Sequence, residues 1–177
     1  LMALSQVNDR DLADALDVLA KSPVGTIYLV DSFGSFYSEQ VRDLTLIYLD
    51  AVKGTGKQIG FHAHHNQQLA YANTLEALIV GANYLDATIN GMGRGAGNCP
   101  LELLLGFLKN PKFHVRPVLA CIQDHFLQLR DQMEWGYQIP YMLTGALNQH
   151  PRTAIAWRAG KTPDDYVSFY DQVIEEE

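Results

Sequence analysis

Cysteines, basic residues and long hydrophobic runs are scarce in this sequence, and each shortage excludes a class of protein. Only Cys99 and Cys121 occur among the 177 residues, which is too few for a disulfide framework or a zinc site made of cysteines alone. We expect both to be reduced thiols. No apolar run approaches the roughly 18 residues that a transmembrane helix needs, and aspartates interrupt the first twenty positions, so neither a membrane span nor a signal peptide is expected. These features predict a cytoplasmic protein.

The net charge and the composition exclude further classes of protein. Thirteen lysines and arginines against twenty aspartates and glutamates give a formal net charge of -7. Because the sequence also has no basic stripe, nucleic-acid binding is not expected. The sequence is 47% hydrophobic and 19% charged, which is typical of a globular protein and excludes collagen, coiled coils and disorder. Its length suffices for one hydrophobic core and is short for two.

Short apolar runs alternate with amphipathic stretches along the first 121 residues. The runs have the length and composition of buried parallel strands. They are Leu1 to Ser5, Thr26 to Asp31, Ile59 to His64, Tyr84 to Ile89 and Val115 to Cys121. Apolar residues at helical spacing predict helices between them, at Asp9 to Ala20, Ser38 to Val52 and Leu69 to Val80.

Local signals mark the ends of these helices. Asn8 stands where an N-cap is expected before the first helix. Gly54 and Gly56 follow the second helix, and Gly81 stops the third, as glycine commonly does beyond a helix C-terminus.

The spacing of the strand candidates predicts the architecture. They recur about every 25 to 32 residues, which is the rhythm of a (β/α) barrel or of a doubly wound sheet. A complete barrel of eight units needs about 250 residues. Five strands in the first 121 residues therefore predict an α/β fold, the C-terminal half of a (β/α)8 TIM barrel, whose N-terminal half is missing. The alternative is a complete small doubly wound domain.

The pattern changes after Cys121. Helices are predicted at Asp124 to Trp135, Tyr141 to His150 and Asp164 to Glu176, with glycines and prolines in the connections. We therefore divide the chain into a partial barrel at residues 1–122, about strands 4 to 8, and a helical C-terminal extension at residues 123–177. The extension is rich in Tyr, Met and Trp, and such a surface is typical of a core or of a contact in a homo-oligomer.

The sharpest chemical signal is the segment His62-Ala63-His64-His65-Asn66 at the end of a predicted strand. Residues i and i+2 of a strand lie on the same side, so His62 and His64 should project together and His65 should point away. Two imidazoles placed in this way can bind one divalent ion, and α/β barrels have their active sites at the C-terminal ends of strands. The alternative is a pair of packed, hydrogen-bonded histidines.

A glycine-rich segment from Asn90 to Asn98 follows the next predicted strand. Its glycines let the backbone approach a ligand closely, although the spacing fits neither a dinucleotide fingerprint nor a P-loop. Asn98 could offer an amide oxygen to a cation, and Arg94 could meet a substrate carboxylate. The adjacent Cys99 is interpreted as a buried thiol rather than a nucleophile.

Two aspartates complete the candidate groups. Asp31 and Ser32 open the turn Asp31-Ser32-Phe33-Gly34 at the end of a predicted strand. Asp31 could serve a metal, a substrate or the cap of the loop, and these alternatives stay open. Asp86 lies within a predicted strand among apolar neighbours, so its burial would require a partner. No G-x-S-x-G motif is present, which disfavours serine hydrolase chemistry.

The ordered series of motifs resembles a known family. D-S-x-G at Asp31, H-A-H-H-N at His62 and G-M-G-x-G-A-G-N at Gly91 are similar to the 4-hydroxy-2-oxovalerate aldolase group. This group lies within the superfamily of metal-dependent pyruvate aldolases, hydroxymethylglutaryl lyases and isopropylmalate synthases. The resemblance covers Leu1 to Leu108.

The resemblance implies a TIM barrel in which Mn²⁺ or Mg²⁺ is held by His62 and His64. Asn98 matches an asparagine that completes the metal sphere in some relatives. The ion would bind a small 2-oxo acid and stabilise the pyruvate enolate while a 4-hydroxy-2-oxo acid is cleaved to pyruvate and an aldehyde, as in the catabolism of aromatic hydrocarbons. By the same resemblance, Tyr137 or Tyr141 would correspond to a proton-donating tyrosine.

The sequence also departs from the family pattern. The first-strand Arg-Asp pair, which would supply the enolate-stabilising arginine and another metal ligand, is absent, so the chain alone should be catalytically incomplete. The C-terminal helices match only loosely, which puts a partnership with an aldehyde dehydrogenase in doubt. Two alternatives remain: an acyl-CoA and 2-oxo acid condensing synthase, or a non-catalytic fragment that dimerises through open strand edges.

Overall fold

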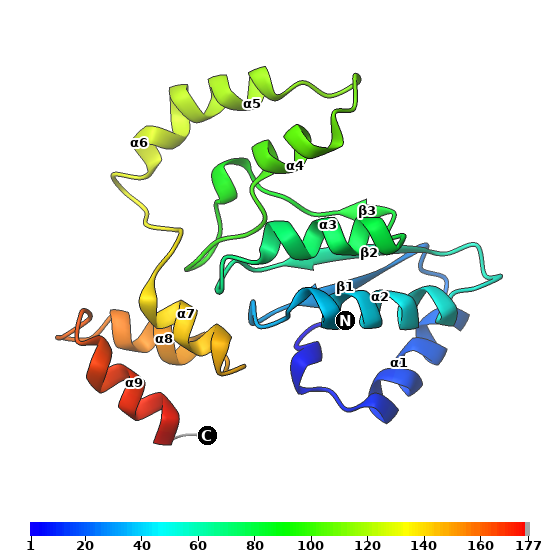
Figure 1. Ribbon diagram of the computed structural model, residues 1–177, viewed down its shortest axis with the longest axis horizontal. Coiled ribbons are helices and arrows are strands. Elements are labelled where there is room, and N and C mark those ends of the chain that lie inside the picture. Colours follow the sequence, from blue (N-terminus) through cyan, green and yellow to red (C-terminus); the bar gives the residue numbers. More distant parts are fainter. Residues whose placement is uncertain (176–177) are drawn as a thin grey trace.

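The computed structural model describes residues 1–175 and has α/β architecture, with one three-stranded parallel sheet (Figure 1). The strands are β1 (Thr26–Asp31), β2 (Gln58–Ala63) and β3 (Tyr84–Leu85), in the spatial order β1-β2-β3. β1 pairs in parallel with β2, and β2 with β3. Because parallel strands all end at the same edge, the residues that follow β1, β2 and β3 lie close together in space.

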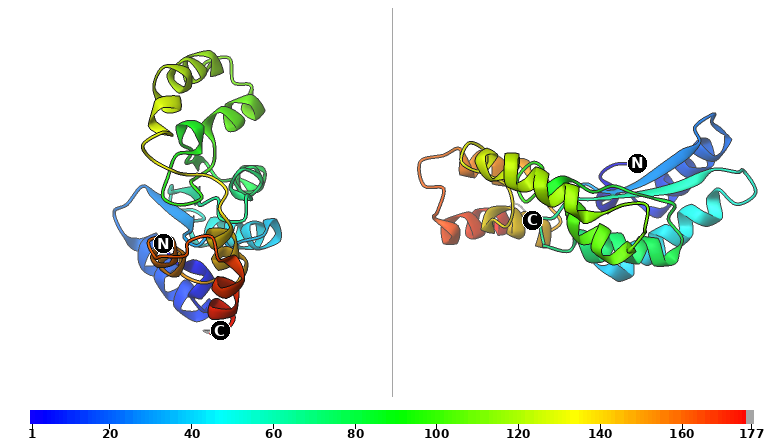
Figure 2. Two further views of the ribbon diagram at one scale, coloured as in Figure 1. Left: turned by 90° about the vertical axis from the view of Figure 1, so that its left-hand side faces the viewer. Right: turned by 90° about the horizontal axis from the view of Figure 1, so that it is seen from above.

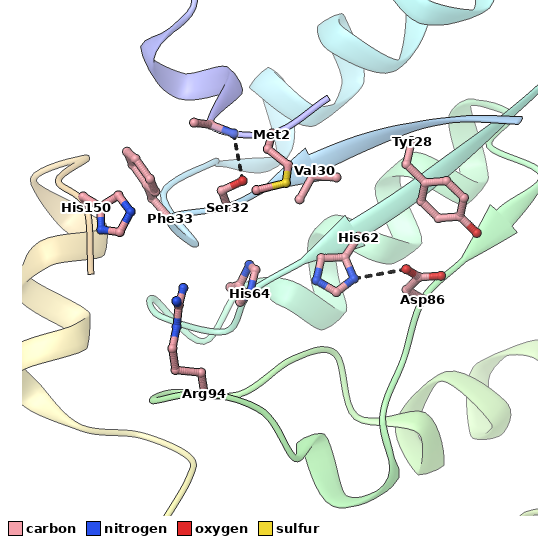
Figure 3. A pocket seen from close by; sticks show the side chains of 11 residues that line it. Met2, Tyr28, Val30, Ser32, Phe33, His62, His64, Asp86, Arg94 and His150 are labelled. Atoms are coloured by element: carbon pink, nitrogen blue, oxygen red, sulfur yellow. Dashed lines mark hydrogen bonds and ion pairs between the residues drawn. The ribbon is translucent and has the colours of Figure 1, made fainter. Parts of the chain in front are cut away.

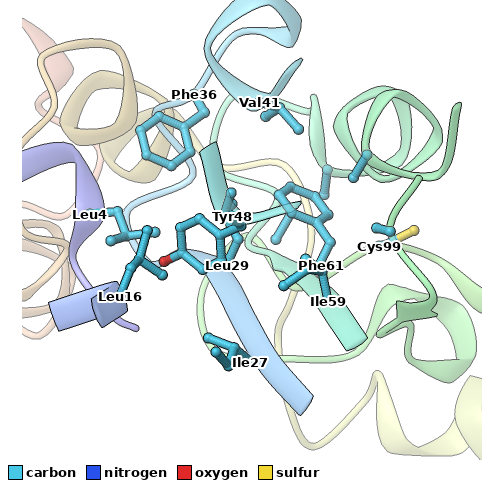
Figure 4. Packing of buried hydrophobic residues seen from close by; sticks show 14 of the residues in the cluster. Leu4, Leu16, Ile27, Leu29, Phe36, Val41, Tyr48, Ile59, Phe61 and Cys99 are labelled. Atoms are coloured by element: carbon cyan, nitrogen blue, oxygen red, sulfur yellow. The ribbon is translucent and has the colours of Figure 1, made fainter. Parts of the chain in front are cut away.

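Three helices pack on one face of this sheet. They are α1 (Asp9–Lys21), α2 (Ser38–Ala51) and α3 (Ala70–Val80). Apolar side chains from α1, α2 and the inner face of the strands form the main core (Figure 4), and these include Leu16, Leu29, Tyr48, Ile59 and Phe61. Burial alternates along β1, so every second side chain projects to the opposite face, which no helix among α1–α3 covers.

The predicted helix ends agree with the structure. α1 begins after Asn8, whose side chain accepts a hydrogen bond from the backbone N–H of Asp11 at 2.9 Å. α3 ends at Gly81, where φ is 129°, a value that favours glycine. Both predictions are confirmed.

The prediction of a strand at Val115–Cys121 is wrong, because these residues form helix α5. A short apolar run does not by itself distinguish a strand from a helix, and Val115, Val118 and Leu119 also follow a helical spacing. Pro117 lies in the first turn of α5, where the missing N–H costs no helical hydrogen bond.

Two other strand predictions need correction. Leu1 to Ser5 is not a strand: Leu4–Gln6 is the 3-10 helix η1, although the amino group of Leu1 donates to the carbonyl of Tyr28 at 2.6 Å. In the predicted strand Tyr84 to Ile89, only Tyr84–Leu85 is extended and paired, and Ile89–Gly91 is the 3-10 helix η2. The part of the chain described here therefore contains three strands where five were predicted.

The remaining helices form two groups (Figures 1 and 2). α4 (Leu101–Leu108), α5, the π-helical turn η3 (Ile122–Phe126) and α6 (Leu127–Leu129) make an arm that extends from the sheet. α7 (Ile139–Ala146), α8 (Arg152–Arg158) and α9 (Tyr166–Glu175) form a separate cluster around a second core. This second core includes Tyr141, Ala154, Phe169 and Val173.

These bounds correct the predicted C-terminal helices. The helix predicted at Asp124 to Trp135 begins earlier, at Val115, and its α-helical part ends at Leu129. The helix predicted at Tyr141 to His150 lies at Ile139–Ala146. The last predicted helix corresponds to α9, and its predicted end, Glu176, lies outside the described residues.

Both cysteines are free thiols, Cys99 buried and Cys121 half-buried, as predicted. Within residues 1–175, no helix has the length and apolar character needed to cross a membrane.

Candidate metal centre

A cavity of about 600 Å³ lies on the face of the sheet opposite the main core (Figure 3). One wall is largely apolar and includes Met2, Val30, Phe33 and the ring of Tyr28, whose hydroxyl interacts with Asp86. Polar side chains come from every strand end and from the C-terminal helices. They are Ser32, His62, His64, Asp86, Arg94 and His150.

His62 and His64 lie side by side in this cavity, as their spacing along the chain predicts. His62 belongs to β2 and His64 follows its last residue. The two ring centroids are 5.0 Å apart in an edge-to-face arrangement, and both rings line the cavity (Figure 3). Two imidazoles at this separation can reach a common small ligand.

Each of the two rings has its Nδ1 atom occupied by a fixed partner. Nδ1 of His64 is 2.9 Å from the backbone carbonyl oxygen of Asp31, and Nδ1 of His62 is 3.1 Å from a carboxylate oxygen of Asp86. A carbonyl only accepts hydrogen bonds, so Nδ1 of His64 carries the proton and its Nε2 presents a lone pair. The carboxylate imposes the same tautomer on His62. Histidines that bind metals typically have their second nitrogen held in this way.

The electrostatic environment keeps His64 neutral. Burial lowers the pKa of His64 below its usual value, and the positive charge of Arg94, with that of His62 when its ring is protonated, lowers it further, while the hydrogen bond to Asp31 opposes this. An imidazole must be deprotonated at one nitrogen to bind a metal. His64 is therefore prepared to act as a ligand at neutral pH.

His65 has a different role, as the strand alternation predicts. Its Nδ1 accepts a hydrogen bond from the backbone N–H of Ala70 at 3.2 Å, which satisfies a donor in the first turn of α3. The backbone N–H of His65 donates to the carbonyl of Gly97 at 2.8 Å. His65 thus fixes α3 and the glycine-rich loop rather than lining the cavity.

Asp31 is positioned as the cap of a loop, one of the three roles left open by the sequence. Its side chain is only 2% exposed, and its two carboxylate oxygens accept hydrogen bonds from the N–H groups of Ser35 at 3.0 Å and Phe36 at 3.2 Å. Burial raises the pKa of Asp31 to about 6, and the backbone hydrogen bonds only partly offset this effect. The carboxylate faces the loop, so a contact with substrate through this group is not what the structure provides.

The glycine-rich loop brings Asn98 next to His64 and Arg94 to the cavity. Gly97 has φ of +83°, and a Cβ atom there would lie 2.1 Å from the carbonyl oxygen of Gly91, so only glycine fits. The backbone of Asn98 pairs with that of His64 in an isolated antiparallel β-bridge. The side-chain Nδ2 of Asn98 donates to the carbonyl of Met92 at 3.0 Å. Its Oδ1 is buried without a hydrogen-bond partner, an uncommon state for a buried acceptor.

Neither candidate tyrosine lines the cavity. Tyr137 is 58% exposed on the connection before α7. Tyr141 is buried, and its ring lies so close to Gly95 that a Cβ there would be 2.5 Å away. Tyr141 therefore supports the glycine-rich loop from behind, and the structure does not bring either phenol to the histidine pair.

Two cavity residues were not assigned to the site from the sequence. Asp86 follows β3, its side chain is 46% exposed, and its carboxylate has a partner in His62. The sequence signal that could have placed Asp86 in the site was an acidic residue within an apolar run. His150 lies between α7 and α8, with its ring against Phe33 at a centroid separation of 5.2 Å. No local pattern connects residue 150 with residue 33, because the tertiary packing creates that contact.

The donor set fits part of a metal site. Within residues 1–175, no group of three or more His, Cys, Asp or Glu side chains is placed to hold an ion. The histidine pair with free Nε2 atoms and the unpaired amide oxygen of Asn98 are suited to a divalent cation that takes nitrogen and oxygen ligands. Further ligands would have to come from outside this chain segment or from substrate.

One family model and several known proteins match the sequence of this chain. A family model described as HMGL-like matches residues 1–124. The chain is 45% identical over 87 residues to an oxaloacetate decarboxylase of Mycobacterium tuberculosis, covering 49% of this chain and 25% of that protein. It is 38% identical over 106 residues to a 4-hydroxy-2-oxovalerate aldolase of Mycolicibacterium smegmatis, covering 60% of this chain and 30% of the relative. The chain thus spans less than a third of either relative's length.

Solved structures give the same picture of the fold. The N-terminal domain of a proposed aldolase from Bacteroides vulgatus superimposes with a TM-score of 0.74 at 32% identity, covering 95% of this chain and 55% of that one. The carboxyl transferase domain of Rhizobium etli pyruvate carboxylase gives a TM-score of 0.65 at 18% identity, covering 90% of this chain and 28% of that one. The second likeness concerns the fold alone.

The buried Asp31 carboxyl group should make stability depend on pH. Its folded-state pKa of about 6 lies above the ordinary value of 3.8, so its contribution is fully present below pH 3.8 and is lost as the pH rises through 6. Relative to Asp31→Asn, the metal-free wild-type chain should lose about 2 kcal/mol of unfolding free energy between pH 4 and pH 7. Urea unfolding across this range measures the difference. A relative stability that rises with pH would show that the backbone amides outweigh burial.

Proposed function

The chain belongs to the HMGL-like family, and from this premise we propose that it provides the histidine part of the active site of a divalent-metal-dependent aldolase. The reaction is the cleavage of a 4-hydroxy-2-oxo acid, such as 4-hydroxy-2-oxovalerate, to pyruvate and an aldehyde. The observation that carries the proposal is the pair His62 and His64, whose rings share one cavity with both Nδ1 atoms engaged. The class is a carbon–carbon lyase, in keeping with the relatives named above.

The architecture proposed for the complete protein is a (β/α)8 barrel, of which this chain is the C-terminal half. Residues 1–122 would form the partial barrel and residues 123–177 the helical extension. The proposal is supported by the parallel sheet with its helices on one face and by the short span of the chain relative to the aldolase. The N-terminal half would then supply the remaining ligands and catalytic groups.

The proposed cofactor is Mn²⁺ or Mg²⁺. Nε2 of His62 and Nε2 of His64 would hold the ion, and Oδ1 of Asn98 would add an oxygen ligand, which would satisfy an acceptor that has no partner in the described residues. When bound, the ion supplies Lewis acidity that stabilises the negative charge developing on the 2-oxo acid.

The other residues would orient the ligands and the substrate. Asp86 and the Asp31 carbonyl fix the tautomer of the two rings, and Ser32 and Arg94 are proposed to contact substrate. The apolar wall would pack against the carbon atoms of the substrate. Neither Tyr137 nor Tyr141 is included as a proton donor, because neither lines the cavity.

A second candidate is the decarboxylation of oxaloacetate, favoured by the 45% identity to a decarboxylase. Both reactions break the bond between C3 and C4 of a 2-oxo acid and leave the electron pair on C3. They differ in what leaves, a neutral aldehyde carbonyl or carbon dioxide. A condensing synthase that uses acyl-CoA, and a non-catalytic dimerising fragment, remain further alternatives. We also propose a cytoplasmic homo-oligomer and propose no aldehyde dehydrogenase partner.

Manganese binding tests the histidine assignment. His62→Ala and His64→Ala should each weaken Mn²⁺ binding at least about tenfold, because each removes a ligand. His65→Ala should leave affinity within about twofold, since its ring is engaged with α3. Calorimetric titration measures the affinities, with the exposed His125→Ala as a matched control. Equal losses for all three cavity-region variants would contradict the shared face of His62 and His64.

The contact between Asp86 and His62 predicts that Asp86 also affects Mn²⁺ affinity. Asp86→Ala should lower Mn²⁺ affinity about 10-fold to 100-fold, because His62 would lose the partner that fixes its tautomer and orientation. Asp86→Asn retains an acceptor oxygen and should recover part of this loss. The exposed Asp171→Ala on α9 removes the same charge far from the cavity. If it weakened binding as much as Asp86→Ala, the effect would be one of net charge and not of the hydrogen bond.

A further inference from the structure

The two ends of the cavity carry opposite charges. Among the cavity-lining residues that the structure describes, Asp86 is the one carboxylate, and it lies beside His62. Arg94 extends from the glycine-rich loop toward the end where Phe33 and His150 lie (Figure 3). The histidine pair separates these two ends. An anionic group is therefore attracted at the Arg94 end and repelled beside Asp86.

Arg94 brings an unneutralised cation to this end. No carboxylate in residues 1–175 forms an ion pair with it, and its charge is close enough to influence both His64 and His150. A guanidinium group has five N–H donors and no acceptor, in a planar arrangement that matches carboxylate and phosphate oxygens.

His150 adds a neutral donor. Its Nδ1 accepts a hydrogen bond from the backbone N–H of Arg152 at 3.1 Å, so the proton of the neutral ring must be on Nε2. Partial burial and the positive charges of Arg152 and Arg94 lower the pKa of His150, which favours this neutral form. The ring is held edge to face against Phe33.

Ser32 provides another donor at the same end. Its Oγ accepts a hydrogen bond from the backbone N–H of Ala3 at 2.8 Å. The hydroxyl hydrogen has no acceptor among the described residues and remains available to a ligand in the cavity. Arg94, His150 and Ser32 thus offer donors from three separate segments of the chain.

We propose that Arg94, His150 and Ser32 form a binding site for an anionic group, a carboxylate or a phosphate, on the aldehyde half of the substrate. The inference rests on the proposed function, in which the 2-oxo acid end lies at His62 and His64. It narrows the proposed substrate class from 4-hydroxy-2-oxo acids in general to those with a second anionic group beyond C4, a group that 4-hydroxy-2-oxovalerate itself lacks. At the opposite end the C1 carboxylate would lie beside Asp86, where the proposed cation would offset the repulsion, while the second anionic group is attracted by Arg94.

The reaction preserves this contact. The bond between C3 and C4 breaks and its electron pair stays on C3, while the C4 hydroxyl loses its proton to water and becomes the aldehyde carbonyl. C3 then takes a proton from water to give pyruvate. The anionic group stays on the aldehyde fragment throughout, so Arg94 stabilises substrate and product alike. In a decarboxylation the anionic group itself would leave as neutral carbon dioxide, and Arg94 would oppose that step.

Paired ligands with and without the second charge test the site. The Mn²⁺-loaded chain is titrated calorimetrically with 2-oxoglutarate and 2-oxoadipate, and with the singly charged 2-oxopentanoate and 2-oxohexanoate. At low salt, at least one of the doubly charged ligands should bind at least about tenfold more tightly than its singly charged partner, the scale of a charge-assisted hydrogen bond. Higher salt should reduce this preference, because the site is open to solvent.

Variants assign the preference to residues. Arg94→Gln should abolish it and His150→Gln should reduce it, and both should weaken the binding of the doubly charged ligands much more than that of 2-oxopentanoate. Arg116→Gln and His114→Gln make the same chemical changes at exposed positions and should retain the preference. Equal binding of both ligand classes, or an Arg94→Gln variant that weakens both classes equally, overturns the inference, since the second result would place the shared C1 carboxylate at Arg94.

The metal-free chain separates this inference from the proposed function. If the chain fails to bind Mn²⁺, the histidine pair does not form a metal site in this chain, and the anion site is then tested with inorganic phosphate alone. Phosphate binding that disappears in Arg94→Gln but persists in Arg116→Gln supports the anion site. Phosphate binding that is absent, or equal in wild type and Arg94→Gln, contradicts it.

Discussion

The hydrogen bonds to the Nδ1 atoms of His62 and His64 are the interactions on which the rest of the site depends. They exist because the register of the sheet aligns Asp31 with Ala63 and Phe61 with Leu85. The first pairing puts the Asp31 carbonyl beside His64, and the second puts Asp86 beside His62. A shift of one residue would turn both imidazoles into the main core. The chemistry of the pair is thus a direct consequence of strand pairing.

Loops held to the strand ends complete the cavity. The Asp31 carboxylate holds the backbone at Ser35 and Phe36, and this turn carries Ser32 and Phe33 into the cavity. His65 binds the carbonyl of Gly97, which holds the glycine-rich loop against the end of β2. The buried Tyr141 supports the same loop at Gly95. At the ends of β1 and β2, neighbouring residues therefore have different tasks. One, such as Ser32 or His64, lines the cavity, and the next, such as Asp31 or His65, holds a loop in place.

The sequence predicts the sheet, its three helices and the histidine pair well, and it predicts the C-terminal region poorly. β1, α1, α2 and α3 follow from hydrophobic periodicity with clear end signals, and the common face of His62 and His64 follows from strand alternation. Val115–Cys121 was misassigned because seven residues of mixed apolar character fit a strand or a helix equally well. The positions of Tyr137, Tyr141 and His150 depend on how the α7–α9 cluster packs, which no local pattern specifies. Asp86 was noticed in the sequence, but its contact with His62 follows from the pairing of β2 with β3 and could not be predicted from it.

The central claim is that Nε2 of both His62 and His64 binds one divalent ion while Nδ1 is engaged by the protein. The most direct measurement is the anomalous scattering of Mn²⁺ in crystals of the chain grown with manganese. The account predicts one peak within coordination distance of both Nε2 atoms, with Asp86 and the Asp31 carbonyl still bonded to Nδ1. A peak bound to only one of the rings, or manganese elsewhere with the pair unoccupied, would contradict it.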